Sequence, residues 1–320
     1  MAKVISKKTE TKIKLGVNGF EKEILKKRVE VLKTYKIYIG GKFPRTESGR
    51  YYMATNSNSE KLANMCLSSR KDFRDAVVAA RKAFGDWGTR YAFNRAQILY
   101  RVAEMLEGRK AQFVDELIKQ DIPRKQAEEE VNLSVDRLIY YAGWCDKFQQ
   151  VFSAVNPVGC PHFNFSTPEP TGVVSVIAPQ NSSLLGLVSV IAPVLAGGNT
   201  CVVLASYSKP LCAVSFAEVL NSSDVPGGTV NILTGNPTEL LSWFSNHMDV
   251  NAVIYCENDN EGSHKTIREN ASLNMKRAVF YAGTNWMNEN AQSPYMIMDT
   301  QEIKTTWHPI EGIGGAGGGY

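Results

Sequence analysis

Thiols and imidazoles are the side chains of this chain best suited to attack a substrate or hold a metal, and they are scattered along it. No two cysteines form a CxxC pair, and no histidine stands at ligand spacing from one. The pattern therefore indicates neither a zinc centre nor a disulfide framework, and we expect reduced thiols and no metal site. These residues are Cys66, Cys145, Cys160, Cys201, Cys212, Cys256, His162, His247, His264 and His308.

The composition is that of a globular chain, with 320 residues of which 43% are hydrophobic and 21% charged. Such a chain can form one large domain or two smaller ones. No apolar run reaches the roughly 20 residues of a spanning helix, and the Lys-rich start lacks the apolar region of a secretory signal. We expect a cytoplasmic protein with no membrane partner.

Positive charge is concentrated at the start of the chain. Residues 1–50 carry a net charge of about +9, although the whole chain carries only +4. A basic segment can contact nucleic acid or anionic lipid. Within it, Phe20–Lys33 spaces apolar residues as an amphipathic helix does, which indicates a charged face in solvent. Because no nucleic-acid module accompanies it, we interpret residues 1–34 as a basic helical arm and expect no nucleic-acid partner.

Helical patterns dominate the next region, residues 35–152. Tyr35–Phe43 reads as a strand, a Gly-Gly turn and a second strand. Apolar residues then recur at helical spacing, which predicts a helical layer packed on the domain that follows. The predicted helices are 71–85, 94–107, 112–120 and 126–144, the last with Val131, Val135, Leu138, Ile139 and Ala142 inward.

Residues 153–170 break this pattern. Asn156–Pro161 has turn chemistry, and Phe163–Ser166 alternates like a half-buried strand. We therefore expect a β-hairpin that separates the helical front from the rest of the chain.

Strands and helices alternate from residue 171 to residue 286. Thr171–Ala178 is a continuous β-branched run, typical of a strand covered on both faces of a parallel sheet. The alternation predicts an α/β fold with a Rossmann-like doubly wound parallel sheet. The predicted strands are 171–178, 200–204, 229–233, 252–255 and 276–282, and the predicted helices are 181–196, 210–220, 238–247 and a last one from residue 262.

Several ordered stretches resemble the aldehyde dehydrogenase superfamily. They include Glu169–Val174, Ile177–Asn181, Ala192–Thr200 and Pro226–Gly235. Each stretch is a weak signal alone, and the ordered set is a strong one. The resemblance implies a cofactor, NAD or NADP, and an oxyanion donor at Asn181. An alternative interpretation of Asn181 is that it caps the following helix. The cofactor-binding positions carried over are Ile177, Ala178, Pro179, Gln180, Asn181, Ser208, Gly235 and Gly262.

The departures from the family pattern concern the cofactor. Ala205–Ser208 replaces the Lys and Glu that grip the adenosine ribose in the family. Tyr255–Asn258 replaces the family's pyrophosphate-binding helix start, and Glu257 and Asp259 put negative charge there. Glu257 could instead satisfy the donors of that helix start. We therefore expect NAD or NADP binding to be weak or lost.

The catalytic residues of the family are also replaced. Tyr281 stands where the resemblance places the general base Glu, and a tyrosine of ordinary pKa, near 10, is a poor base at neutral pH. Cys256 aligns with a threonine and has no activating base nearby, so we do not expect a nucleophile there. The family's catalytic domain, which carries the nucleophilic cysteine, is expected to be missing after residue 286.

The end of the chain resembles the family's last strand. Residues 290–310 are expected to be a terminal oligomerisation strand that joins the hairpin at 153–170, and residues 311–320 a flexible glycine-rich tail. The amino-acid sequence around Trp144 and at Ser182–Val188 most resembles a short, divergent bacterial branch related to the family 16 double-domain proteins. In that branch a degenerate unit accompanies a complete dehydrogenase.

Three functional hypotheses follow. The leading one is a non-catalytic subunit that assembles with a full-length aldehyde dehydrogenase or with itself. The second is an NAD(P)-dependent aldehyde oxidoreductase that is active only in a complex. The third is a nucleotide-binding sensor. The sequence does not identify the aldehyde, the cofactor preference or the stoichiometry.

Overall fold

The computed structural model describes residues 31–258 and 262–310. The chain divides into two units, Met1–Lys33 and Thr34–Tyr320. The helix predicted over Phe20–Lys33 lies, as far as residue 30, outside the described residues, and so does the predicted tail at 311–320. The account below concerns the second unit.

A five-stranded parallel sheet forms the centre of this unit, in the order β10-β9-β6-β7-β8. Every residue of β6, β7, β8 and β9 is buried, as their nearly continuous apolar sequences predict. The α/β, doubly wound prediction is therefore confirmed. The strands are β6 (Val173–Ile177), β7 (Thr200–Leu204), β8 (Val230–Leu233), β9 (Ala252–Tyr255) and β10 (Arg277–Phe280).

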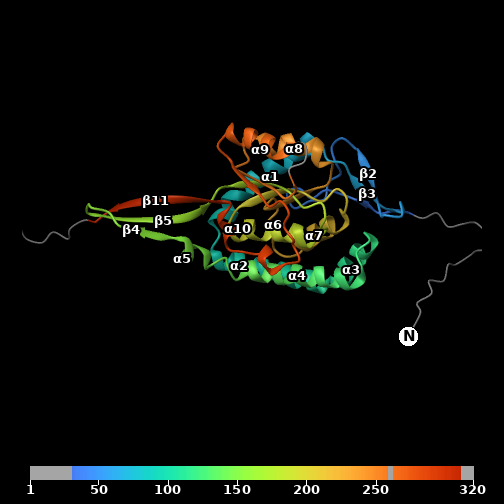
Figure 1. The fold of residues 1–320 in the computed structure, drawn as a ribbon, viewed down its shortest axis with the longest axis horizontal. Helices are drawn as coiled ribbons and strands as arrows, with labels where there is room; N and C mark the ends of the chain where they lie inside the picture. The colour runs from blue at the N-terminus through green and yellow to red at the C-terminus, as the bar shows by residue number, and fades with distance from the viewer. Residues whose placement is uncertain (1–30, 259–261, 311–320) are drawn as a thin grey trace, which may run out of the picture. The chain divides into compact units, whose positions relative to one another are not determined.

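Helices cover both faces of this sheet (Figure 1). One face carries α1 (Arg70–Thr89), α8 (Pro237–Asn246) and α9 (Ser263–Ser272). The other carries α6 (Leu185–Ala196) and α7 (Leu211–Asn221), which are in turn covered by α2 (Ala92–Gly108), α3 (Lys110–Lys119) and α4 (Arg124–Ala142). This outer layer is the predicted N-terminal helical layer. One predicted core position is wrong, because Ile139 on α4 is 41% exposed.

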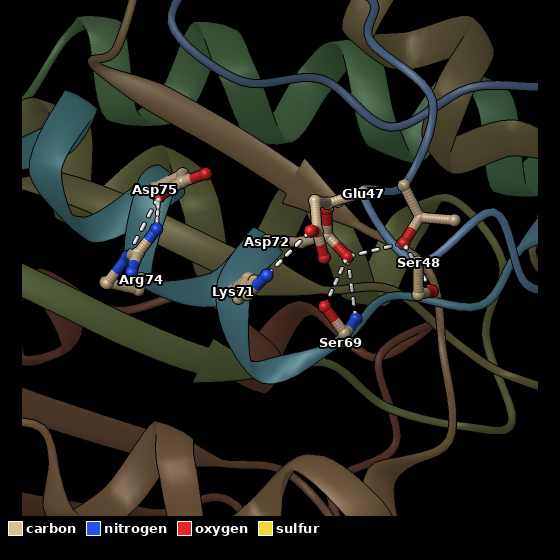
Figure 2. A network of polar contacts seen from close by, with 8 residues as sticks. Glu47, Ser48, Ser69, Lys71, Asp72, Arg74 and Asp75 are labelled. Carbon is tan, nitrogen blue, oxygen red and sulfur yellow. Dashed lines mark hydrogen bonds and ion pairs between the residues drawn. The ribbon is translucent and has the colours of Figure 1, made fainter.

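A buried carboxylate fixes the start of α1. Asp72 accepts hydrogen bonds from the Ser69 backbone N–H at 2.7 Å, from the Glu47 backbone N–H at 2.9 Å and from the Thr46 hydroxyl at 2.5 Å. Figure 2 shows this group beside the exposed pair of Lys71 and Glu47. Asp72 therefore completes a capping box and also ties the loop at residues 46–47 to the helix.

The N-terminal strands differ from the prediction at 35–43. The Gly40-Gly41 turn is present, with both residues at positive φ, but the second strand is not. Tyr38 instead exchanges backbone hydrogen bonds with Ile232 of β8, which takes this segment to the central sheet. The small sheet beside it, in the order β1-β3-β2, contains a hairpin that the sequence analysis missed. Its strands are β1 (Thr34–Tyr35), β2 (Tyr51–Thr55) and β3 (Lys61–Cys66).

A third sheet, in the order β11-β5-β4, extends to one side of the body (Figure 1). We call it the β-arm; it consists of β4 (Ala154–Asn156), β5 (His162–Pro170) and β11 (Gln301–Pro309), and α5 (Phe148–Phe152) leads into it. The terminal strand does pair with the predicted hairpin, antiparallel along all nine residues of β11. It begins later than predicted, since Tyr295–Met298 forms the helical turn α10 after the short 3-10 helix η1 (Glu289–Ala291).

Candidate functional site

The strand order of the central sheet reverses between β6 and β9. From β6 the chain runs outward to β7 and β8, and it then returns to β9 and β10 on the other side. Ligands of open α/β sheets bind at such a switch point, outside the carboxyl ends of the strands. Here that edge is formed by the loops after Ile177 and Tyr255. It is the candidate site.

Gln180, in the loop after β6, is the centre of a hydrogen-bond network at this edge. Its backbone N–H donates to Glu257 Oε1 at 2.6 Å, which joins the loops after β6 and β9. Its side-chain amide donates to the Ala178 carbonyl at 3.1 Å and accepts from the Tyr207 backbone N–H at 2.7 Å. The chain itself therefore bridges the switch point.

The loop after β7 also forms hydrogen bonds with Gln180. The hydroxyls of Ser206 and Ser208 both donate to the Gln180 carbonyl, at 3.0 and 2.7 Å. Tyr207 stacks on Tyr52 of β2 with ring centroids 4.5 Å apart. Four polar groups of Gln180, two of the backbone and two of the side chain, thus have partners within the protein.

A pocket of about 280 Å³ lies beside this network. Asn181 enters it from the loop after β6, where its side chain is exposed. The other lining residues come from the loops after β9 and β10 and are mostly polar. They are Cys256, Glu257, Asn258, Gly283, Thr284, Asn285 and Trp286. A polar, open hollow of this kind can hold a small polar molecule.

Asn181 does not cap the helix that follows it, so that interpretation is wrong. Helix α6 begins at Leu185, and its first backbone N–H groups are satisfied from another element. Glu130 of α4 accepts from the N–H groups of Leu184 and Leu185, both at 3.1 Å, and from the Ser182 hydroxyl at 3.1 Å. A buried carboxylate at a helix N-terminus compensates both the unsatisfied donors and the helix dipole.

Tyr281 lies at the carboxyl end of β10, but it is not a lining residue of the pocket. Its hydroxyl donates to Asp299 Oδ2 at 2.6 Å. Burial, and then the neighbouring Asp299 charge, raises the pKa of Tyr281 far above its usual value. Burial also raises the pKa of Asp299, against the opposing effects of the Tyr281 hydroxyl and of Arg277. A tyrosine held protonated in this way cannot accept a proton at neutral pH.

Cys256 lines the pocket but is only 5% exposed. Burial, and then the adjacent Glu257, raises the pKa of its thiol well above its usual value. The thiolate is the nucleophilic form of cysteine, so this thiol is unreactive. All six cysteines are unpaired, and Cys160 is the exposed one.

The remaining predicted positions spread around the sheet edge. Ile177, Ala178 and Pro179 are buried backbone neighbours of Gln180. Gly235 follows β8 and packs against Ser68 and Leu240, away from the pocket. Gly262 precedes α9 at φ +75° with open space around it.

The sequence suggested that Glu257 could satisfy the backbone donors at the start of the last helix, α9. Glu257 does not cap α9, so this interpretation is wrong. Its carboxylate accepts from the Gln180 N–H in the loop after β6. Asp259, the other acidic residue predicted there, lies outside the described residues.

The connection from β10 to β11 is short and anchored to the helical layer. Arg137 of α4, 2% exposed, donates to the carbonyls of Ala291 and Trp286 at 2.6 and 3.3 Å and to the Ser189 hydroxyl at 2.7 Å. The Tyr141 hydroxyl and Ser293 add contacts at 3.3 Å. Residues 281–300 therefore form an ordered cover over α4 and α6.

Sequence reasoning missed Glu130, Arg137 and Asp299. For the first two a signal was available, because both occupy the inward stripe of α4 beside Val131 and Leu138. A charge on an apolar stripe indicates a buried partner. Asp299 carried no local signal, since its partner Tyr281 is 18 residues away.

Within residues 31–258 and 262–310, no group of three or more His, Cys, Asp and Glu side chains is placed to hold a metal ion. None of the helices there combines the length and the apolar character needed to cross a membrane.

Residues 44–301 match the model of the aldehyde dehydrogenase family. The chain belongs to this family. Among its aldehyde dehydrogenase relatives, the cytosolic 10-formyltetrahydrofolate dehydrogenase of Mus musculus is 30% identical over 274 residues, which are 83% of this chain and 30% of the relative. The mitochondrial 10-formyltetrahydrofolate dehydrogenase of Homo sapiens is 28% identical over 298 residues, 91% of this chain and 31% of the relative.

Solved structures agree with the family assignment. The aldehyde dehydrogenase from Bacillus cereus, solved as an NAD+ complex, is 26% identical with a TM-score of 0.73 over 78% of this chain and 51% of the other. HpcC from Thermus thermophilus, at 24% identity and a TM-score of 0.74, shares the fold over 78% of this chain and 48% of the other. This aldehyde dehydrogenase-family chain thus spans about a third to a half of the length of these relatives.

Proposed function

We propose that this chain is a non-catalytic aldehyde dehydrogenase-like subunit that assembles with a full-length aldehyde dehydrogenase. The observation that carries the proposal is the Tyr281–Asp299 hydrogen bond at 2.6 Å. Tyr281 stands where the resemblance places the family's base, and it is not among the lining residues of the pocket. The one thiol among those lining residues, Cys256, is buried and has a raised pKa, which makes it a poor nucleophile for aldehyde oxidation.

The residues at the switch point fit a dinucleotide poorly. Phosphates are usually held by free backbone N–H groups at this edge. In this chain the Gln180 N–H already donates to a carboxylate, and the Gln180 carbonyl accepts from Ser206 and Ser208. A phosphate there would have to displace Glu257 and would meet its charge. We therefore infer that NAD or NADP binding is weak or lost.

Exposed apolar side chains support an assembly role. The β-arm presents Val155 and Phe163, 68% and 45% exposed, together with Ile303 and Trp307, 52% and 56% exposed. The strand register puts Ile303 and Trp307 on one face of the sheet and Val155 and Phe163 on the other, so both faces present apolar surface, which can mark an interaction site. These side chains suit contact with another subunit better than contact with water.

The catalytic part of the proposal is tested on the purified chain. We expect no NADH formation from a panel of aldehydes, and no saturable binding of NAD+ or NADP+ by calorimetry up to millimolar concentration. Tight binding without turnover would instead favour a nucleotide sensor. Turnover by the chain alone would refute the proposal.

The assembly part is tested by a tagged pull-down from native cells, followed by native mass determination of the eluted complex. We expect a stoichiometric full-length aldehyde dehydrogenase. Recovery of this chain without such an enzyme, in repeated purifications at low salt, would contradict the assembly role.

One observation favours a second candidate, a subunit that completes an active site in a complex. The Asn181 side chain faces the pocket and is exposed, so it is positioned to donate to a ligand there. In that case Asn181→Ala would lower the activity of the isolated complex by about 100-fold, as loss of one oxyanion donor does. Under the leading proposal the variant complex keeps full activity.

A further inference from the structure

A second pocket, of about 310 Å³, lies at the small sheet of β1, β2 and β3. Its lining shares no residue with the pocket at the switch point. Arg45 and Arg50 bring two guanidinium groups to this lining, and none of the other lining residues carries a carboxylate. Pockets that hold small molecules begin at about 300 Å³. This one therefore has the size and the charge to take a small anion.

The two guanidinium groups keep most of their donors available. Arg50 donates one N–H to Glu239 Oε1 of α8 at 2.6 Å, and no other described residue accepts from its side chain. The Arg45 side chain is exposed, and within residues 31–258 and 262–310 it forms neither a hydrogen bond nor an ion pair. A guanidinium presents its donors in a planar fork that matches an oxyanion. Both side chains can therefore donate to a ligand in the pocket.

The loop that carries both arginines is fixed to the rest of the fold. Before it, the Ile37 N–H donates to the Pro44 carbonyl at 3.2 Å, and after it the Leu67 N–H donates to the Arg50 carbonyl at 3.0 Å. Between these points, the contacts of Asp72 described above tie the loop to α1. A backbone held in this way reduces the entropy that a ligand must overcome when it binds.

The rest of the lining offers apolar surface and open space. Tyr51 of β2 is 67% exposed, and Cys66 of β3 is 4% exposed. Gly49 has φ +68°, and no atom lies within 4 Å of the position that a Cβ would take. An aromatic ring and a neutral thiol beside two guanidinium groups suit a ligand that joins an anionic group to an apolar body.

We propose that this pocket binds a small organic anion, with a carboxylate or phosphate group held by Arg45 and Arg50 and a planar body against the Tyr51 ring. Guanidinium groups bind both kinds of oxyanion through paired N–H donors. The ion pair with Glu239 orients Arg50 and compensates its charge, whereas Arg45 supplies a charge that no described carboxylate compensates.

Calorimetric titration of the full chain with benzoate, phenyl phosphate and benzyl alcohol tests this site. The three probes share a phenyl group, and only the first two carry an anion. We expect saturable binding of at least one anion at millimolar concentration, and none of benzyl alcohol. The anion that binds more tightly identifies the group that the pocket prefers. Absence of saturable binding by both anions, or equal binding of benzyl alcohol, would overturn the proposal.

Two matched variants locate the bound anion. Arg45→Gln removes the uncompensated charge and breaks no hydrogen bond or ion pair of the described residues, so it should weaken binding of the preferred anion by about tenfold or more. Arg74→Gln is the control, because that side chain is exposed on α1 and lies outside the pocket lining. This control should bind the anion as the native chain does.

Equal affinity of Arg45→Gln and the native chain would place the anion elsewhere and overturn the assignment. An equal loss of affinity in both variants would show only a general effect of surface charge, and would overturn it too. The inference does not depend on the proposed loss of catalysis, because these titrations contain neither an aldehyde nor NAD(P).

Discussion

Tyr281 joins two parts of the fold through one hydrogen bond. Its side chain is half-buried, and its hydroxyl donates to Asp299, a residue that precedes β11. The pair therefore links the end of the central sheet to the start of the β-arm. The hydroxyl of Tyr281 thus serves structure.

Removing the Tyr281 hydroxyl should expose this structural role. Tyr281→Phe leaves the half-buried Asp299 carboxylate without this donor, and we expect a loss of about 1 kcal/mol in the free energy of unfolding. Burial raises the pKa of Asp299 in the folded state, so folding opposes its ionisation. The contribution of Asp299 to the free energy of unfolding therefore falls as pH rises through its folded-state pKa. The loss of stability in Tyr281→Phe, measured by urea titration, should therefore be larger at mildly alkaline than at acidic pH. An equal loss at both pH values would contradict this role of the Tyr281 hydroxyl.

Lys276, just before β10, gives a pH dependence of opposite sign. The residue is 7% exposed, and burial lowers the pKa of its ammonium group to about 8. An unfolded lysine titrates near pH 10.4, so between about pH 8 and 10 the unfolded chain binds more protons. The contribution of Lys276 to the free energy of unfolding should therefore rise between about pH 8 and 10, by up to about 3 kcal/mol.

The variant Lys276→Met should lack this rise. The measurement is the difference in free energy of unfolding between the native chain and the variant at several alkaline pH values. A constant difference across the window would show that the ammonium group titrates normally. The native chain and the variant share the tyrosines whose pKa is raised, so the effects of these tyrosines cancel in the difference.

At the scale of elements, the sequence predicted the buried parallel strands well because their signal is local. β7 and β9 were predicted to the residue, since runs such as Thr200–Leu204 are apolar throughout. The β2–β3 hairpin was missed because Tyr51–Thr55 and Lys61–Cys66 carry mixed, half-exposed patterns. Partners such as Glu257 and Gln180 are 77 residues apart, so only the fold brings them together.

Helix α6 offers a test of long-range capping. Glu130 of α4 accepts from two N–H groups at the start of α6, so Glu130→Ala would leave buried donors without a partner. We expect a loss of about 2–4 kcal/mol in the free energy of unfolding. Glu130→Gln, which keeps one acceptor oxygen, should lose less. Equal losses for both variants would mean that the oxygen contributes nothing.

At the scale of the molecule, the segment between β10 and β11 connects the central sheet to the β-arm. Arg137 ties this segment to α4 through carbonyls at 2.6 and 3.3 Å. Arg137→Met should leave these buried carbonyls unsatisfied and cost about 1–3 kcal/mol. Faster protease cleavage between residues 286 and 296 should accompany it.

Arg101→Met is the control, since that side chain is exposed and forms a surface ion pair with Glu104. Its stability and cleavage rate should match those of the native chain. If Arg137→Met also left the cleavage rate unchanged, the segment would be held by its apolar contacts instead.

The pairing of β5 with β11 also determines the order in which parts of the chain fold during synthesis. The two strands lie 139 residues apart between Ser166 and Thr305, so closing this contact is one of the entropically costly steps of folding. During synthesis the central sheet can form before β5 gains its second neighbour, and the β-arm is completed only when β11 has left the ribosome. A nascent or shortened chain that lacks β11 would expose the edge of β5 that β11 covers, while β4 pairs with the other edge. A finished β-arm thereby marks chains that have been synthesised through β11 before any subunit meets another.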